Sequence, residues 1–394
     1  MTALKFNKDI FFLRWGLILG LCVLARLPHI LNENFFYFDD DEALIGIMAQ
    51  EMLRGELFPY FFCGQNYGLS FFETLSVAGC IKIFGSGIWA LRIGGLLLFS
   101  LGITFIYQTL KSRNMSFLFS AGVAVLLITF PTWYLWGAMV RGGYVTSFAA
   151  VSIIFFVTQK KEAFRFENIL MGFLLYTAYE SHVLILIPVL PFVFEWWRDK
   201  PQRWMNAVKI ISTSLILIYG LRYLFSNESQ SYLNPISIEK MKLSTLLSYL
   251  SEWIHSFSGF YFYSVNFNPP DYWQVGLYLL LAVMIVTIIL GVWKISGKKR
   301  TIALLCLVAI VFGFLVLAQV KDYAPRYMIG SYTGILFLVL YLIINSEFYL
   351  KKAMVYTMAL ISFVGITTGS KMPRHWYFGQ QSFLTSLDLV HDYD

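Results

Sequence analysis

Four consecutive carboxylates are the most reactive-looking groups in this sequence: Asp39, Asp40, Asp41 and Glu42. They stand directly before apolar residues with helical spacing, and one carboxylate is enough to cap the N-terminus of such a helix. Four adjacent like charges raise one another's pKa values, which proteins usually tolerate where a proton, a cation or a substrate is handled. The cluster therefore predicts either a helix cap or a site where a carboxylate takes part in chemistry.

Three arginines at the borders of apolar segments supply matching cations: Arg92, Arg141 and Arg326, the last followed by Tyr327. A guanidinium binds phosphate oxygens in a planar, bidentate way that a lysine ammonium does not. A carboxylate that takes a proton from a hydroxyl or amine, beside guanidinium groups that hold an anionic leaving group, suits a group-transfer reaction. The simpler interpretation of each arginine is a side chain that snorkels to a membrane interface.

Six further polar side chains are candidates for substrate contacts: Gln65, Asn66, Tyr67, Glu73, Glu180 and His182. Glu73 begins a second expected surface helix, at about residues 70–84, where its carboxylate would face the headgroup region. Glu180 and His182 fall in an apolar stretch, where ionisable groups are costly and usually pair or line a cavity.

The elements that must position these groups are membrane-spanning helices. Of the 394 residues, 58% are hydrophobic and only 13% are charged, about half the usual share of charge. The apolar runs are about 20 residues long, which at 1.5 Å per helical residue matches the roughly 30 Å hydrocarbon core. This composition excludes a soluble domain and predicts an all-α polytopic integral membrane protein.

About eleven transmembrane segments are expected. Nine are single helices, near residues 10–31, 88–110, 115–136, 142–158, 206–225, 273–293, 301–319, 327–346 and 353–369. The stretch 168–194 is long for one span and short for two. Two short helices that turn near residues 179–182 keep every basic loop on one face, so the pattern favours two.

This assignment places 18 of the 30 Lys and Arg residues, but only 6 of the 23 Asp and Glu residues, on one side of the membrane. The positive-inside rule makes that side cytoplasmic, with the N-terminus cytoplasmic and the C-terminus outside. We expect a single domain over residues 1–394, in a bacterial inner (plasma) membrane. Outside it lie a catalytic loop with two surface helices (32–86), a second large loop (226–271) and a tail (370–394).

Cofactors and other partners leave weaker signals. The four cysteines, Cys22, Cys63, Cys80 and Cys306, lack CxxC spacing and indicate neither a disulfide framework nor a zinc site. No cofactor is certain, although the carboxylates and a histidine could bind a divalent metal ion. The basic residues behind the net charge of +7 lie beside the apolar runs, so the charge indicates orientation in the membrane and not a nucleic acid partner.

Several of these features occur in a familiar order. Asp41-Glu42 opens an amphipathic helix, a second surface helix ends at Phe84-Gly85, Ala90-Leu91-Arg92-Ile93 leads into a span, and Arg326-Tyr327 enters a late one. Together they resemble the GT-C fold membrane glycosyltransferases of the protein O-mannosyltransferase and lipid A aminoarabinose transferase type, or glycosyltransferase families 39 and 83.

The resemblance implies a polyprenyl-phosphate sugar donor, inverting transfer of a hexose or pentose, and an active site on the extracytoplasmic face. It makes Asp41 the general base, with Glu42 beside it and Asp40 as the nearest rival. The acceptor would be an extracytoplasmic glycan, lipid or protein. Where this family type carries Lys-Pro-Pro or a further acidic residue, this sequence has Gln65-Asn66-Tyr67-Gly68 and Arg141, so the donor sugar and the acceptor stay open.

Two other classes of protein fit parts of the sequence. A secondary transporter or lipid-linked-sugar flippase needs polar groups near the bilayer midplane on discontinuous helices, and Glu180 and His182 come nearest to that. A different membrane transferase or polymerase would place its chemistry in the loop 226–271, which offers Glu252 and His255.

Overall fold

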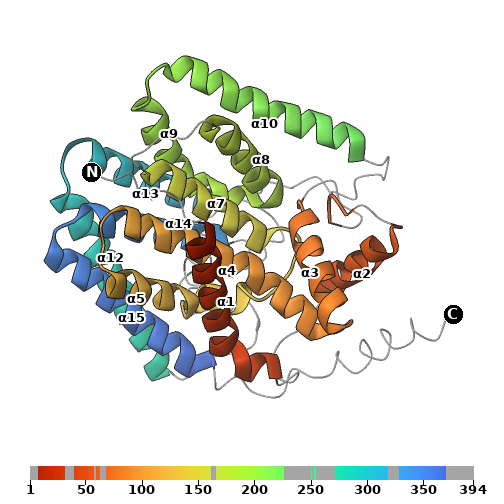
Figure 1. Ribbon diagram of the computed structural model, residues 1–394. Coiled ribbons are helices and arrows are strands. Elements are labelled where there is room, and N and C mark those ends of the chain that lie inside the picture. Colours follow the sequence, from red (N-terminus) through yellow and green to blue (C-terminus); the bar gives the residue numbers. More distant parts are fainter. Residues whose placement is uncertain are drawn as a thin grey trace.

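The computed structural model describes residues 8–31, 40–56, 59–62, 68–160, 166–225, 250, 253, 271–317 and 328–369. Over these residues the regular structure is helical, apart from one isolated β-bridge between Phe61 and Leu69. The helices gather into one bundle, with α10 along one edge (Figure 1). The predicted all-α fold is confirmed.

Every expected span overlaps described helices, whose bounds are α1 Lys8–Leu31, α4 Ile88–Ser112, α5 Phe117–Ile128, α7 Tyr144–Gln159, α8 Glu167–Leu186, α9 Leu190–Arg198, α10 Arg203–Phe225, α12 Asp271–Lys294, α13 Gly297–Leu317, α14 Ile329–Asn345 and α15 Phe348–Gly369. Five described stretches are long and apolar enough to cross a membrane: Asp9–Leu27, Ile88–Ser112, Glu167–Arg198, Arg203–Leu221 and Gly297–Val316. Shorter apolar helices accompany them. The prediction of a polytopic membrane protein is confirmed.

The expected span 115–136 is wrong as one continuous helix. In the structure α5 ends at Ile128, and a separate short helix, α6 (Pro131–Trp136), follows. Proline has no N–H to donate and its ring clashes with the preceding turn, so it is tolerated at the start of a helix and breaks one from inside. Pro131 therefore begins α6 and ends the straight run of α5.

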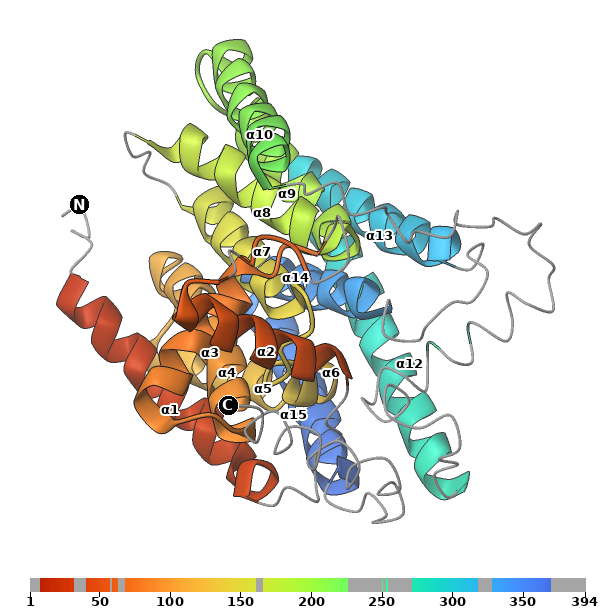
Figure 2. The same cartoon turned by 90° about the vertical axis from the view of Figure 1, so that its right-hand side faces the viewer.

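The centre of the bundle is α14. Each of its residues from Ile329 to Ile344 is buried, as expected for a helix that is apolar on all sides. It contacts α8, α13 and α15 and lies inside the bundle (Figure 2). Phe337 of α14 meets Phe148 of α7 at a ring distance of 6.4 Å, and Phe148 in turn lies 4.3 Å from Trp133 of α6.

The stretch of α8 and α9 enters the bundle and returns to the same end. His182 has extended backbone angles (φ −163°, ψ 92°) inside α8 and kinks the helix there. At the two ends of the stretch, Nζ of Lys200 lies 2.6 Å from Oε1 of Glu167. The predicted pair of short helices with a turn near residues 179–182 is confirmed.

Two helices of the first loop, α2 (Asp40–Arg54) and α3 (Phe71–Phe84), lie side by side against the first half of α4 (Figure 1). Ile45 and Met48 of α2, Val77 of α3 and Leu91 of α4 form a buried apolar cluster. Gly94 allows the close approach, because a Cβ there would lie 2.7 Å from Val77. The expected helices at 41–55 and 70–84 are confirmed, and α2 carries Asp41 and Glu42 in its first turn.

The cysteines do not form a disulfide framework among the described residues. Cys22, Cys80 and Cys306 are free and buried. Cys63 lies outside the part of the chain that the structure describes.

Candidate active site

Four parts of the chain meet at the end of α4 that carries Arg92. They are the first turn of α2, the residues just before α3, the turn before α7, and the kink in α8. The backbone N–H groups of Gly68 and Leu69 both donate to the Glu180 carbonyl, at 3.0 and 2.9 Å. Gly143 approaches Ser181 so closely that a Cβ there would lie 2.8 Å from the Ser181 carbonyl.

The buried ion pair of Glu42 and Arg92 joins α2 to α4. Oε1 of Glu42 lies 2.8 Å from Nη1 of Arg92, and the two side chains are 0% and 1% exposed. Burial raises the pKa of Glu42 to about 7, whereas Arg92 and the backbone N–H of Val140 favour its charged form. Each partner neutralises the other inside the protein, so this pair positions the first turn of α2. The predicted roles of Glu42 in catalysis and of Arg92 in phosphate binding stay predictions.

Asp41, the neighbouring carboxylate, is accessible. Its side chain is 32% exposed, and Oδ2 lies 3.9 Å from Nε of Arg141. The Arg141 guanidinium in turn lies 5.0 Å from the centre of the Trp136 ring, a cation–π contact. A carboxylate, a guanidinium and an aromatic face therefore share one site.

Glu73 is buried, and its expected position facing the headgroup region is wrong. Its Oε2 accepts the backbone N–H of Arg141 at 3.0 Å, and its Oε1 accepts those of Val145 at 3.1 Å and Thr146 at 3.3 Å. The residue before α7 is Gly143, which has no side chain to cap the helix. Glu73 thus supplies from α3 the acceptor that the first turn of α7 lacks.

The same contacts act on the ionisation of Glu73. Burial raises its pKa to about 7, while the backbone N–H groups of Gly143, Thr146, Arg141 and Val145 favour the charged form. The carboxylate is enclosed by the protein and holds the Arg141 turn. Sequence alone gives no sign of this, because the cap comes from another helix. The predicted contact of Glu73 with a substrate stays a prediction.

Glu180 and His182 lie at the kink of α8, next to the start of α7. Glu180 is 3% exposed. The His182 ring lies 4.4 Å from the Tyr144 ring, and the Ser147 hydroxyl donates to the His182 carbonyl at 3.4 Å. The structure thus brings both residues to the same end of the bundle as Asp41 and Arg141. Contact with a substrate stays a prediction for both.

Several predicted residues fall outside the described part of the chain: Asp39, Gln65, Asn66, Tyr67, Arg326 and Tyr327. The side chain of Asp40, the first residue of α2, lies outside it as well. Among the described residues, no group of three or more His, Cys, Asp or Glu side chains could hold a metal ion. The divalent ion stays an untested expectation.

Trp136 and Tyr144 belong to this site although neither was predicted as a site residue. Trp136 lies under Arg141 and also meets the Tyr144 ring at 4.8 Å. Aromatic residues are common throughout this chain, so the presence of an aromatic residue did not mark a site. The sequence feature that could have identified Trp136 and Tyr144 is their position on either side of Arg141.

The arrangement is suited to one kind of chemistry. An exposed carboxylate can accept a proton, the adjacent guanidinium can hold an anion, and the aromatic rings offer a flat apolar surface. The buried pair Glu42–Arg92 and the Glu73 cap hold these groups from behind.

No family profile and no curated protein matches this sequence. Two solved structures resemble its fold, both of ArnT from Cupriavidus metallidurans. The one bound to undecaprenyl phosphate has a TM-score of 0.56 and 12% identity, with 90% of this chain and 64% of that chain covered. The apo structure has a TM-score of 0.53 and 13% identity, with 92% and 75% covered.

The likeness confirms the expected GT-C type of fold. This chain spans a little under two thirds of the ArnT chain that was solved with undecaprenyl phosphate. At 12% identity the likeness concerns the fold alone.

Proposed function

We propose that this chain is a membrane glycosyltransferase that moves a sugar from a polyprenyl-phosphate donor to an extracytoplasmic glycan, lipid or protein, with inversion at the anomeric carbon. The active site is the end of the bundle where Asp41 of the loop 32–86 meets Arg141. The N-terminus is cytoplasmic, in a bacterial inner membrane. The observation that carries the proposal is the pair formed by the accessible Asp41 carboxylate and the Arg141 guanidinium.

Asp41 is the general base in this proposal. Of the two carboxylates Asp41 and Glu42, only Asp41 combines solvent access with an adjacent cation, since Glu42 is closed off against Arg92. The Asp41 carboxylate takes the proton of the acceptor hydroxyl or amine as that atom bonds to the anomeric carbon. The bond from the anomeric carbon to the phosphate oxygen breaks, and the polyprenyl phosphate leaves with the electron pair.

Arg141 holds the phosphate in this proposal. The guanidinium presents a planar fork of donors that suits phosphate oxygens, and its Nε lies at ion-pair distance from the base. The Trp136 ring lies 5.0 Å from the guanidinium and supports its position by a cation–π contact. The likeness to an ArnT that was solved with undecaprenyl phosphate supports a lipid-linked donor.

Substitution of the two adjacent aspartates tests the proposal. Wild type, Asp41→Asn and Asp40→Asn are reconstituted in nanodiscs with an undecaprenyl-phosphate hexose or pentose and a membrane extract as acceptor, and release of undecaprenyl phosphate is measured. We expect Asp41→Asn to lower turnover by about 10² to 10⁴ while donor binding persists, and Asp40→Asn to stay close to wild type. Full turnover in Asp41→Asn at normal expression would overturn the assignment of the base.

A transporter or flippase is the competing function, and the kink at His182 supplies the discontinuous helix that this class needs. Proteoliposomes distinguish the two functions. Movement of the lipid-linked sugar between leaflets without any release of undecaprenyl phosphate would favour transport and contradict transfer.

A further inference from the structure

A polar cavity lies at the opposite end of the bundle from the candidate active site. Arg92 stands in the first turns of α4, and Arg113 caps its other end. The two residues are 21 positions apart along the chain, which at 1.5 Å per helical residue is about 30 Å, the thickness of a hydrocarbon core. The cavity around Arg113 has a volume of about 640 Å³, within the usual range for small-molecule sites.

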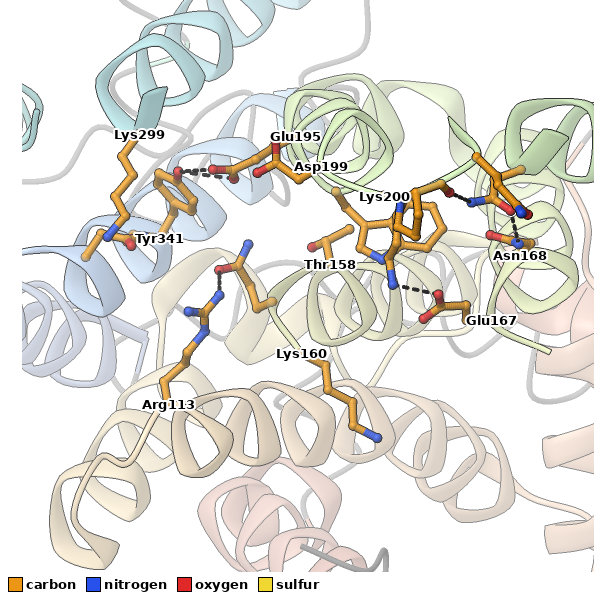
Figure 3. Close-up of a pocket in the computed structure, with 16 residues that line it drawn as sticks. Arg113, Thr158, Lys160, Glu167, Asn168, Glu195, Asp199, Lys200, Lys299 and Tyr341 are labelled. Atoms are coloured by element: carbon orange, nitrogen blue, oxygen red, sulfur yellow. Dashed lines mark hydrogen bonds and ion pairs between the residues drawn. The ribbon is translucent and has the colours of Figure 1, made fainter. Parts of the chain in front are cut away.

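Charged side chains from several helices line this cavity (Figure 3). Its cations are Arg113, Lys160, Lys200 and Lys299, and its anions are Glu167, Glu195 and Asp199. The proposed function uses none of these residues. The cluster sits where the basic loops gather, which the positive-inside rule assigns to the cytoplasmic face.

Partners within the protein already engage the carboxylates. Glu167 pairs with Lys200 at 2.6 Å, and Asp199 lies 3.6 Å from Lys298 and 3.3 Å from Arg198. Both oxygens of Glu195 accept the Tyr341 hydroxyl, at 3.1 and 3.2 Å. These contacts leave the carboxylates little capacity to attract a further cation.

Arg113 and Lys299 differ from the other charged groups. Of the residues that the structure describes, none places a carboxylate within ion-pair distance of either side chain. Arg113 donates from Nη2 to Oε1 of Gln159 at 3.0 Å, while its buried Nε has no hydrogen-bond partner in the described structure. Burial lowers the pKa of Arg113, against the charge of Glu195, so its cation is poorly solvated. In Figure 3 Lys299 extends from α13 toward Tyr341, on the same side of the cavity as Arg113.

We propose that this cavity binds a phosphate group, with Arg113 as the principal cation and Lys299 at the rim. An incoming phosphate would accept hydrogen bonds from the Arg113 guanidinium and replace the solvation that burial removes from it. Basic pockets between helices on the cytoplasmic side typically take the headgroups of anionic lipids. A soluble phosphomonoester carries the same chemistry. The site stands apart from glycosyl transfer, and binding to it is measured without a transfer assay.

Thermal unfolding in detergent tests the proposal with defined probes. Cardiolipin, phosphatidylcholine and glycerol 3-phosphate are titrated separately into wild type, Arg113→Gln, Lys299→Gln and Lys209→Gln. Lys209 of α10 is the matched control, because it loses the same charge, is exposed and lies outside the cavity lining. Lys299 is exposed, so its substitution tests the site even if Arg113→Gln folds poorly.

We expect cardiolipin, but not phosphatidylcholine, to raise the unfolding temperature of wild type. Half-saturation should need about tenfold more cardiolipin in Arg113→Gln and about threefold more in Lys299→Gln, with Lys209→Gln like wild type. The same pattern with glycerol 3-phosphate, and no greater effect of cardiolipin, would support the site and assign it to a soluble ligand. Equal stabilisation of all four proteins would overturn the proposal. So would the absence of stabilisation by both cardiolipin and glycerol 3-phosphate.

Discussion

The Glu42 carboxylate lies 2.8 Å from the Arg92 guanidinium, and neither side chain reaches solvent. One residue earlier, Asp41 points a partly exposed carboxylate at Arg141. Successive residues in a helix point about 100° apart, so the buried pair fixes the direction in which its neighbour faces the site. In the proposed function, Glu42 positions the first turn of α2 and Asp41 carries out the chemistry.

Removal of one partner of this buried pair should be far more damaging than removal of both. Arg92→Met leaves Glu42 without its cation, and we expect it to lower the free energy of unfolding by about 3–5 kcal/mol. The double variant Glu42→Leu with Arg92→Met should recover most of that loss. Thermal unfolding in detergent measures both, with Arg54→Met, at the exposed end of α2, as the control. Equal losses in the single and double variants would argue against an energetic coupling of the pair.

Stability should fall as the pH rises from about 4.5 through about 7. Burial raises the pKa values of Glu42 and Glu73 from 4.5 to about 7, so between these values the folded protein holds more protons than the unfolded chain. The stabilisation from both groups is complete below about pH 4.5 and is lost as each ionises near pH 7. Unfolding temperatures across this range measure the slope.

The variant Glu73→Gln assigns a share of that pH dependence. It removes one of the two ionisations, so its slope should be shallower than that of wild type, and the double variant with Glu42→Gln should be shallower again. Glu73→Gln should also be less stable than wild type at low pH, because an amide NH₂ group replaces one of the two oxygens that accept backbone N–H groups. A slope identical to wild type would contradict the proposed titration of Glu73.

Gly143→Ala should disrupt the contact between the Arg141 turn and the kink in α8. Gly143 has a φ of 112°, and a Cβ would lie 2.8 Å from the Ser181 carbonyl, so both backbone strain and a clash oppose the substitution. We expect a loss of more than about 1 kcal/mol in stability, together with a large loss of activity. Gly122→Ala in α5 is the control, since nothing lies within 4 Å of a Cβ there. Wild-type behaviour of Gly143→Ala would mean that this contact is not needed.

Arg141→Lys should weaken donor binding while it preserves charge. A lysine loses the bidentate fork and the contact with the Trp136 ring, so we expect the KM for the polyprenyl-phosphate sugar to rise about tenfold. Steady-state kinetics against donor concentration measure this, with Arg54→Lys as the control. An unchanged KM would mean that a cation other than Arg141 binds the donor phosphate.

Sequence reasoning was most accurate where a local pattern determines the structure. The start of α2 follows from acidic residues directly before an amphipathic pattern. The turn in 168–194 follows from the need to keep basic residues on one face. The same reasoning was wrong at residues 115–136, where an apolar run hid the effect of Pro131 on the helix.

Contacts between residues far apart in the chain could not be predicted from the sequence pattern. The burial of Glu73 depends on a helix start about 70 residues away, and the pairing of Glu42 with Arg92 depends on how α2 packs on α4. A single sequence indicates which groups are charged, but it does not indicate which of them tertiary packing encloses. The cavity at Arg113 was missed for the same reason, since its lining comes from several separate helices.

The burial of α14 has a consequence for the biosynthesis of this protein. The ribosome makes residues 329–345 after most of the bundle, yet this helix fills the space among α8, α13 and α15. Earlier helices must therefore stay loosely associated in the membrane until α14 arrives. Nascent chains arrested before residue 329 should be sensitive to proteases, and resistance should appear only once α14 has left the ribosome.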